Sequence, residues 1–96
     1  MVATFEEAVD ACLANVRQVL MDRRKKYGSE NINRHGLSGL VVRLDDKLAR
    51  LGHSLTDHPD ETCYDTLVDV VGYGIIGLMW IHNWWGLPLG DDNRPD

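Results

Sequence analysis

Apolar residues recur at intervals of three and four in three separate stretches of this chain. That spacing places them on one face of an α-helix, because the helix turns once in about 3.6 residues. The pattern predicts helices over about 4–26, 37–51 and 60–84. We therefore expect an all-α, three-helix bundle-like protomer with a long central C-terminal helix, assembling as a homo-oligomer. In this prediction residues 1–86 form a single helical domain, and 87–96 form an extended or flexible tail.

The first predicted helix carries signals at both ends. Thr4 and Glu7 have the spacing of a capping box, and the basic run 23–26 lies where cations stabilise the negative end of a helix. Helix-end stabilisation on a solvated face explains this run, and a phosphate-facing role is the alternative. The apolar stripe that we expect to face the core comprises Phe5, Ala8, Val9, Cys12, Leu13, Val16, Val19 and Leu20.

The other two predicted helices are bounded by glycine and proline. We expect Gly52 to follow the end of the second helix and Pro59 to lie at the start of the third. The third helix is apolar on nearly every side from Leu67 onward, and it ends in a group of tryptophans. Large apolar side chains are hard to bury within one small protomer, so we expect homo-oligomerisation through helix 60–84.

Composition narrows the classes of function. The net charge of −5 argues against an extended nucleic-acid surface, which is normally basic. Cys12 and Cys63 fit reduced thiols on apolar helix faces in the cytoplasm, and a disulfide or a metal ligand is the alternative. The apolar run 68–85 is interrupted by Asp69, His82 and Asn83, so we interpret it as a buried helix and expect no membrane span.

Two charged clusters lie on neighbouring predicted helices. The first cluster falls on one stripe of helix 37–51 and comprises Arg43, Asp46, Lys47 and Arg50. In the second, Glu61, Asp65 and Asp69 step by four along helix 60–84. Asp69 lies in an apolar run, where an unpaired carboxylate costs several kcal/mol, so it requires a cation, a metal ion or a donor. Bases and acids on adjacent helices favour a site for a phosphorylated ligand, and simple ion pairs on a solvated face are the alternative.

Three segments carry a resemblance to a known family. They are Lys-Tyr-Gly at 26–28, Gly-Leu-Val-Val-Arg-Leu-Asp-Asp-Lys at 39–47, and Asp-Thr-Leu-Val-Asp-Val-Val-Gly-Tyr at 65–73. Over about residues 20–82 the chain resembles the small helical "nucleotide modification associated" family, found mostly in phages and bacteria. That family is similar in outline to the MazG-like all-α nucleoside triphosphate pyrophosphohydrolases. The resemblance implies a nucleotide ligand and, for a phage product, a place in the host cytoplasm.

The chain departs from the MazG-like pattern at its metal ligands. Those enzymes hold Mg²⁺ with a Glu-x-x-Glu pair on one helix and a Glu-x-x-Asp pair on the next. Here Arg43 and Thr66 stand where two of those acids would be. The carboxylates that remain for a Mg²⁺ site are Asp46, Asp65 and Asp69, with Glu61 nearby. This weaker acidic set puts hydrolysis in doubt and leaves phosphate binding intact.

The interpretation that we favour is a protein that binds and sequesters a small nucleotide, linear or cyclic, and needs no cofactor. Arginines would bind its phosphates, an aromatic ring would stack on its base, and the long polar connection 27–36 would close the pocket. The resemblance implies that a phage protein of this kind counters a host defence. The predicted ligand-binding residues are Arg43, Asp46, Lys47, Arg50, Asp65, Asp69, Tyr27, Tyr73, Asn31, Asn33 and His35.

Two other functions stay open on the sequence alone. The first is a Mg²⁺-dependent nucleotide pyrophosphohydrolase, in which Glu61, Asp65 and Asp69 would serve the chemistry. The second is a structural or protein-interaction module, in which the charged clusters only pair with each other.

Overall fold

The computed structural model describes residues 1–54 and 60–90, which form four α-helices and no strand. They are α1 (Phe5–Tyr27), α2 (Glu30–Asn33), α3 (Gly36–Ser54) and α4 (Glu61–Ile81). The all-α prediction is confirmed. The count of three was wrong, because the polar connection after α1 contains the single-turn helix α2. The expectation for Pro59 and most of the expected tail, 91–96, lie outside the described residues.

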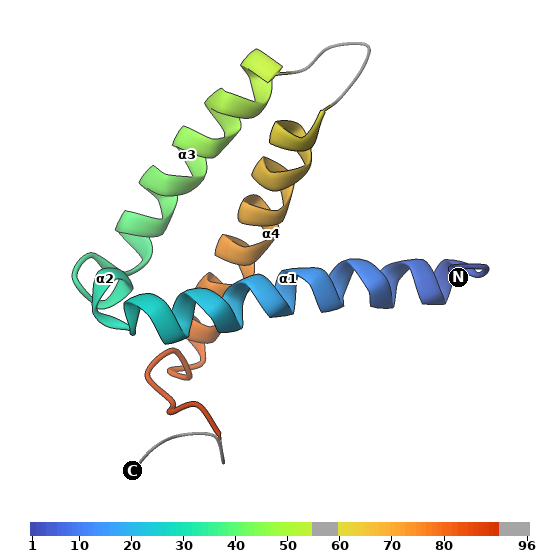
Figure 1. The fold of residues 1–96 in the computed structure, drawn as a ribbon. Coiled ribbons are helices and arrows are strands. Elements are labelled where there is room, and N and C mark those ends of the chain that lie inside the picture. Colours follow the sequence, from blue (N-terminus) through green and yellow to red (C-terminus); the bar gives the residue numbers. More distant parts are fainter. Residues whose placement is uncertain (55–59, 91–96) are drawn as a thin grey trace.

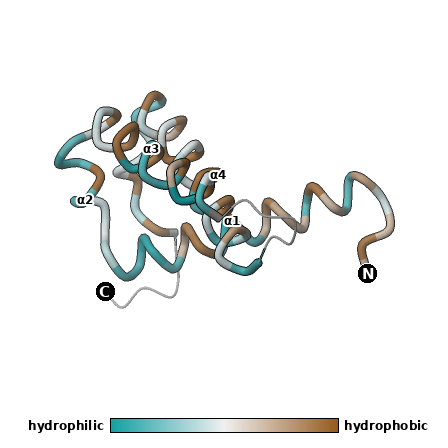
Figure 2. Tube along the Cα trace, turned by 90° about the horizontal axis from the view of Figure 1, so that it is seen from above, coloured by the Kyte–Doolittle hydropathy of each residue, from teal (hydrophilic) through white to brown (hydrophobic). Residues whose placement is uncertain are grey.

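Helix α4 is the centre of the fold. It contacts both α1 and α3, and α2 packs on α3. Figure 1 shows α3 and α4 running antiparallel, with α1 crossing α4. Seen from above in Figure 2, the N-terminal half of α1 projects away from the other helices. We call this projecting segment, residues 5–14, the α1 arm.

The helix ends follow local chemistry. Thr4 caps α1 in the expected capping box, in which its hydroxyl accepts a hydrogen bond from the Glu7 backbone N–H. The Glu7 carboxylate accepts in turn from the backbone N–H groups of Ala3 and Thr4, and these two bonds lower the pKa of Glu7. At the other end, Gly28 stops α1 with a φ of 69° and donates its N–H to the Arg24 carbonyl.

Two of the predicted helix ends were wrong. Gly52 lies inside α3, because the helix continues to Ser54. Helix α4 ends at Ile81, three residues before the predicted end. Asn83 follows with a φ of 63°, a left-handed conformation that turns the chain back on itself. As a result Trp85 leaves the helix and folds into the core, where only 8% of it is exposed.

A small core holds the elements together. It comprises Ile32, Leu40, Ile76 and Trp85, with Leu20, Tyr73, Met79 and Trp80 packed against them. Two of the α4 glycines lie where other elements approach: a Cβ at Gly72 would lie 3.6 Å from Leu20, and one at Gly77 would lie 3.9 Å from Leu37 and Leu40. Their small size allows α1 and α3 to pack closely on α4.

The predicted core face of α1 is mostly uncovered. Of that stripe only Val16 is buried, while Phe5, Val9, Leu13 and Cys12 are exposed. Most of the stripe lies beyond the point where α1 crosses α4, and there it lines an open apolar groove with Val71 of α4 instead of a packed helix interface. The expectation that the whole stripe faces the core of the protomer was therefore wrong.

Helix α4 is also largely exposed for an apolar helix. Within the described residues it is the one helix whose length and hydropathy would allow it to cross a membrane, and 17% of its most apolar window is buried. A helix that packs against another protein chain meets the same criterion, so length and composition alone do not separate the two.

Candidate functional site

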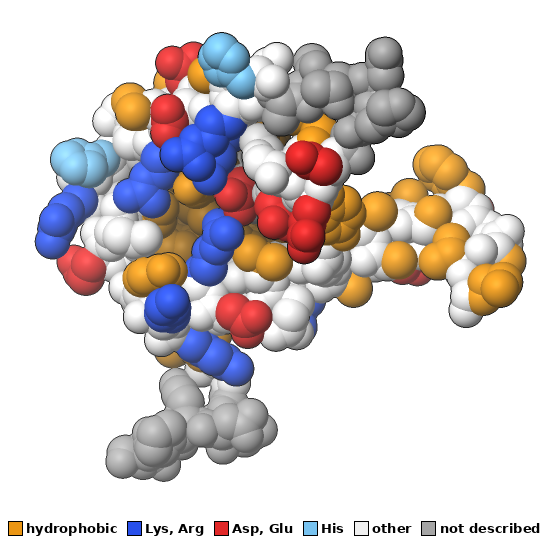
Figure 3. Space-filling model, turned by 45° about the horizontal axis from the view of Figure 1, so that its top comes forward, with side chains coloured by type: hydrophobic (Ala, Val, Ile, Leu, Met, Phe, Trp, Pro, Cys, Tyr) orange, Lys and Arg blue, Asp and Glu red, His pale blue; other side chains and the backbone are white. Residues whose placement is uncertain are grey.

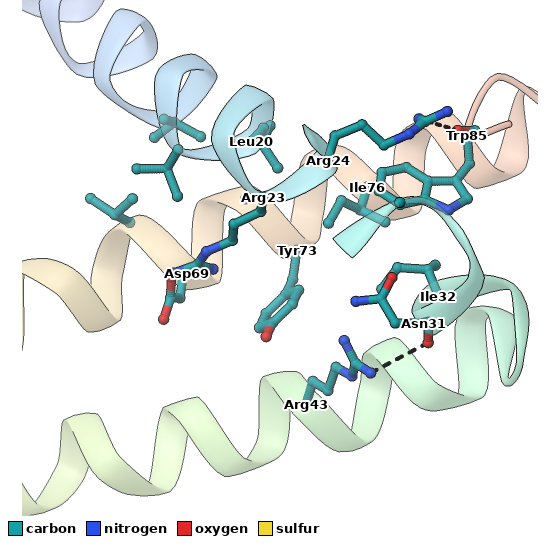
Figure 4. Close-up of a pocket in the computed structure, with 15 residues that line it drawn as sticks. Leu20, Arg23, Arg24, Asn31, Ile32, Arg43, Asp69, Tyr73, Ile76 and Trp85 are labelled. Atoms are coloured by element: carbon teal, nitrogen blue, oxygen red, sulfur yellow. Dashed lines mark hydrogen bonds and ion pairs between the residues drawn. The ribbon is translucent and has the colours of Figure 1, made fainter. Parts of the chain in front are cut away.

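A pocket lies where the C-terminal half of α1, the loop with α2, and the middles of α3 and α4 converge (Figure 4). Its volume is about 80 Å³. It is lined by Val16, Val19, Leu20, Arg23, Arg24, Gly28, Asn31, Ile32, Arg43, Val68, Asp69, Gly72, Tyr73, Ile76 and Trp85. Figure 3 shows basic side chains gathered round a hollow with a hydrophobic floor.

Asp69 is the acidic centre of this site. It is 8% exposed, and each carboxylate oxygen meets a cation. Oδ1 lies 2.8 Å from a guanidinium nitrogen of Arg23 on α1, and Oδ2 lies 2.9 Å from Nζ of Lys47 on α3. The sequence predicted that the Asp69 carboxylate needs a partner, and it has two cationic partners. Because the three residues come from three helices, the ion pairs also fix α1 and α3 relative to α4.

Arg43 lines the side of the pocket opposite Asp69. It is half-buried on α3, and one guanidinium nitrogen donates to the Asn31 carbonyl at 3.4 Å. A guanidinium carries five N–H donors. Among the described residues Arg43 uses one of them for Asn31, so most of its donors remain for a ligand. Figure 4 shows Arg23 and Arg43 on opposite sides of Tyr73, which points into the space between them.

Trp85 closes the end of the pocket next to α2. Its indole N–H donates to the Ser29 carbonyl at 3.1 Å, and the Arg24 guanidinium lies 5.4 Å from its ring centroid. Arg24 also donates to the carbonyls of Trp85 and Leu87, at 2.9 and 2.7 Å. These contacts bind the segment after α4 to the end of α1. We call them the Trp85 clasp.

A shallower groove continues past Arg43. It has a volume of about 330 Å³ and is lined by His35, Ser38, Gly39, Val42 and Arg43. Arg43 belongs to both hollows, so a ligand bound to its guanidinium can extend into either. This matters because the inner pocket is small: whole small-molecule ligands usually occupy roughly 300–1,000 Å³. The inner pocket alone fits a phosphate group or the edge of a ring.

The structure brings together about half of the predicted ligand-binding residues. Arg43, Asp69, Tyr73 and Asn31 line the pocket, Lys47 contacts it through Asp69, and His35 lines the adjoining groove.

The other predicted residues are exposed and line none of these hollows. They are Tyr27, Asn33, Asp46, Arg50 and Asp65. Arg50 is two helical turns from Arg43, about 10 Å along α3, which places it beyond the pocket. Asn33 bonds to the Ser29 hydroxyl, and the Tyr27 ring lies beside the Lys26 ammonium.

The proposed carboxylate set for Mg²⁺ is not assembled. Among the described residues there is no group of three or more His, Cys, Asp or Glu side chains arranged to hold a metal ion. Asp46 and Asp65 are exposed, and Glu61 lies at the first turn of α4, two turns from Asp69. Both oxygens of Asp69 already face cations.

Among the charged, polar and aromatic residues that line the pocket, three were not among the predicted site residues. Arg23 and Arg24 belong to the basic run at the end of α1, for which the helix-end explanation was preferred. The spacing contained a signal for Arg23. This residue lies three positions after Leu20 and therefore on the same face of α1 as the apolar stripe. Trp85 had no periodic signal, since it lies after the end of α4.

Comparison of the chain with protein-family models, with curated proteins and with solved structures found no match. The geometry of this pocket is therefore the basis for assigning a function.

Proposed function

We propose that this protein binds a phosphorylated nucleotide, linear or cyclic, at the pocket between α1, α3 and α4 and sequesters it unchanged. The observation that carries this proposal is the convergence of cations from two helices on a pocket with an aromatic and apolar wall. Arg23 and Arg43 flank Tyr73 at the pocket, and Lys47 forms an ion pair with Asp69. A small anion with an attached ring system has the chemistry that fits such a wall.

The local charge supports an anionic ligand despite the net charge of −5 for the whole chain. Arg23, Arg24, Arg43 and Lys47 contribute four positive charges against the single carboxylate of Asp69, which leaves three in excess. A phosphate dianion offsets most of that excess, and guanidinium groups bind phosphate oxygens with two parallel hydrogen bonds. Solvent screens the charges of Asp69 and Lys47, which are mostly buried, less than it screens the half-exposed Arg23.

Size determines how the ligand would lie. The inner pocket has room for a phosphate or a ring edge, so the rest of a nucleotide would extend over Arg43 into the groove beside His35. Binding without chemistry is favoured over hydrolysis because Asp69 is neutralised by two cations, which leaves it a poor ligand for Mg²⁺. A protein that holds a nucleotide messenger in this way lowers the free concentration of that messenger and so counters a host defence that depends on it.

Titration calorimetry of two single variants tests this assignment. We expect Arg43→Ala to weaken binding of the nucleotide ligand by at least about tenfold, because a charge-assisted hydrogen bond contributes roughly 1.5–3 kcal/mol. Lys25→Ala is the matched control, since Lys25 is an exposed cation in the same protein and does not line the pocket. Equal losses in both variants would show that binding depends on overall charge and would refute the assignment of the pocket.

A further inference from the structure

One face of α4 is apolar and exposed along its whole length. Its residues are Tyr64, Leu67, Val71, Gly74, Leu78 and Ile81. Their spacing alternates between three and four, and the five with large side chains are 45–68% exposed. An alternation of three and four, sustained here over more than four turns, is the heptad pattern of a helix that packs along another helix. We call this face the α4 seam.

The α4 seam lies opposite the pocket. At about 100° per residue, its centre is roughly 170° around α4 from Asp69. Helices α1 and α3 pack on the rest of α4, and α1 reaches one edge of the seam, where the Asn15 side-chain amide donates a hydrogen bond to the Tyr64 hydroxyl. A partner on the seam would therefore leave the pocket open.

The exposed apolar surface continues from the seam onto the α1 arm. A groove of about 370 Å³ with an entirely apolar lining joins Val71 on α4 to Ala8, Val9, Cys12, Leu13 and Val16 on α1. Figure 3 shows hydrophobic side chains along the projecting arm. A helix laid on the seam at Val71 would thus also contact the arm. The two uncovered stripes form one continuous surface.

We propose that the α4 seam binds the α4 seam of a second copy of this chain, antiparallel, about a two-fold axis between residues 72 and 73. The seam is its own complement in this arrangement. Leu67 of each copy lies opposite Leu78 of the partner subunit, and Tyr64 lies opposite Ile81 of the partner subunit. An interface in which one patch meets an identical patch is the form that a two-fold dimer requires.

The centre of the seam fits the same axis. Val71 of each copy lies opposite Gly74 of the partner subunit, so a branched side chain meets a residue without one. A Cβ built on Gly74 meets nothing within 4 Å in its own chain, so packing within the protomer does not require glycine there. Glycine in a helix interior costs about 1 kcal/mol relative to alanine, and close approach of a second helix explains its presence.

Charge favours the antiparallel orientation. The start of α4 is acidic, with Asp60, Glu61 and Asp65, and within the described residues its last turn has no acid and is followed by His82. A parallel pair would place the two acidic ends side by side, whereas an antiparallel pair places each acidic end beside the C-terminus of the partner helix. The two helix dipoles also oppose each other in the antiparallel pair.

The area is sufficient for a specific interface. From the exposed fractions of its side chains, the α4 seam offers roughly 500 Å² per copy, so a pair buries about 1,000 Å², the lower bound for a specific contact. The α1 arm adds Phe5, Val9 and Leu13, of which Phe5 alone is 80% exposed. A second copy therefore covers the apolar face that a lone protomer leaves in water.

Sedimentation equilibrium of Gly74→Glu tests the proposal. We expect the wild-type chain to have the mass of at least two copies, and Gly74→Glu to weaken self-association at least roughly 100-fold because it buries two like charges at the axis. Gly52→Glu is the matched control: Gly52 is another exposed helical glycine with nothing within 4 Å of its Cβ position. Circular dichroism checks that both variants stay helical.

Two results would overturn the proposal. The first is a wild-type chain that is monomeric. This includes a chain that stays monomeric and in solution only when detergent is present, which is the behaviour expected if α4 lies in a membrane. The second is equal self-association of Gly74→Glu and the wild type.

The register has its own test, which does not depend on a disruptive charge. In a Cys12→Ser background, Leu67→Cys and Leu78→Cys proteins are mixed and treated with a short bismaleimide. Cross-linked dimers that contain one copy of each variant support the antiparallel register. Cross-linking of each variant with itself, and not with the other, shows a parallel pair and overturns the proposal.

Discussion

At the scale of single residues, Asp69 determines both the stability and the charge of the site. Its two oxygens hold Arg23 and Lys47, of which the first is half-exposed and the second mostly buried. An asparagine keeps the shape but accepts through one atom only, so one cation loses its partner. The same substitution removes the only negative charge that the described pocket lining contains.

We therefore predict opposite effects of Asp69→Asn on stability and binding. The free energy of unfolding should fall by about 1–3 kcal/mol, measured by urea denaturation, because one charged partner is left unsatisfied. Affinity for the nucleotide ligand should be retained or increase, measured by calorimetry at the same ionic strength. Asp65→Asn, one turn earlier and exposed, should change neither. Loss of binding in folded Asp69→Asn would contradict the role assigned to the carboxylate.

At the scale of elements, the Trp85 clasp joins the segment after α4 to α1 and α2. Neighbouring tryptophans allow a matched comparison, because Trp85 is buried while Trp84 is half-exposed and stacks on His82. Trp85→Ala should lower the free energy of unfolding by about 3–5 kcal/mol. Trp84→Ala should lower it by less than about 1 kcal/mol. Urea denaturation followed by circular dichroism measures both, and equal losses would exclude the clasp as a fixed element.

The start of α1 makes a prediction about pH. The backbone bonds from Ala3 and Thr4 lower the pKa of Glu7 from its usual 4.5. A lowered pKa means that ionised Glu7 stabilises the cap fully above pH 4.5, and that this contribution is lost as the pH falls through the lowered value. The amide ¹⁵N shifts of Ala3 and Thr4 should therefore titrate with a midpoint below 4.5. A midpoint at or above 4.5 would show that the capping box does not persist in solution.

At the scale of the whole molecule, the features that depend on local spacing could be predicted from the sequence. The three long helices, the capping box and the need of Asp69 for a partner all follow from residues within a few turns of each other. Trp85 could not be placed, because its position depends on a left-handed residue after α4. The exposure of the α1 arm could not be predicted either, since it depends on the angle at which α1 crosses α4.

The dependence on packing between helices also explains why only about half of the predicted site residues lie at the pocket. Helical periodicity gave the face on which Arg43, Asp46, Lys47 and Arg50 lie, but it could not say which turn of α3 meets the pocket. The structure uses the turns that hold Arg43 and Lys47 and adds Arg23 from α1. Which cations surround a carboxylate is a property of packing between helices, and one sequence records it only indirectly.

The most direct test of the central claim is to incubate the pure protein with nucleoside mono-, di- and triphosphates and cyclic oligonucleotides, with and without Mg²⁺. Chromatography then measures each nucleotide in the ultrafiltrate and again after heat denaturation of the protein. We predict that one nucleotide class is depleted from the filtrate with or without Mg²⁺ and is recovered intact after heating. Recovery of every nucleotide in the filtrate, or release of pyrophosphate that requires Mg²⁺, would contradict sequestration at this pocket.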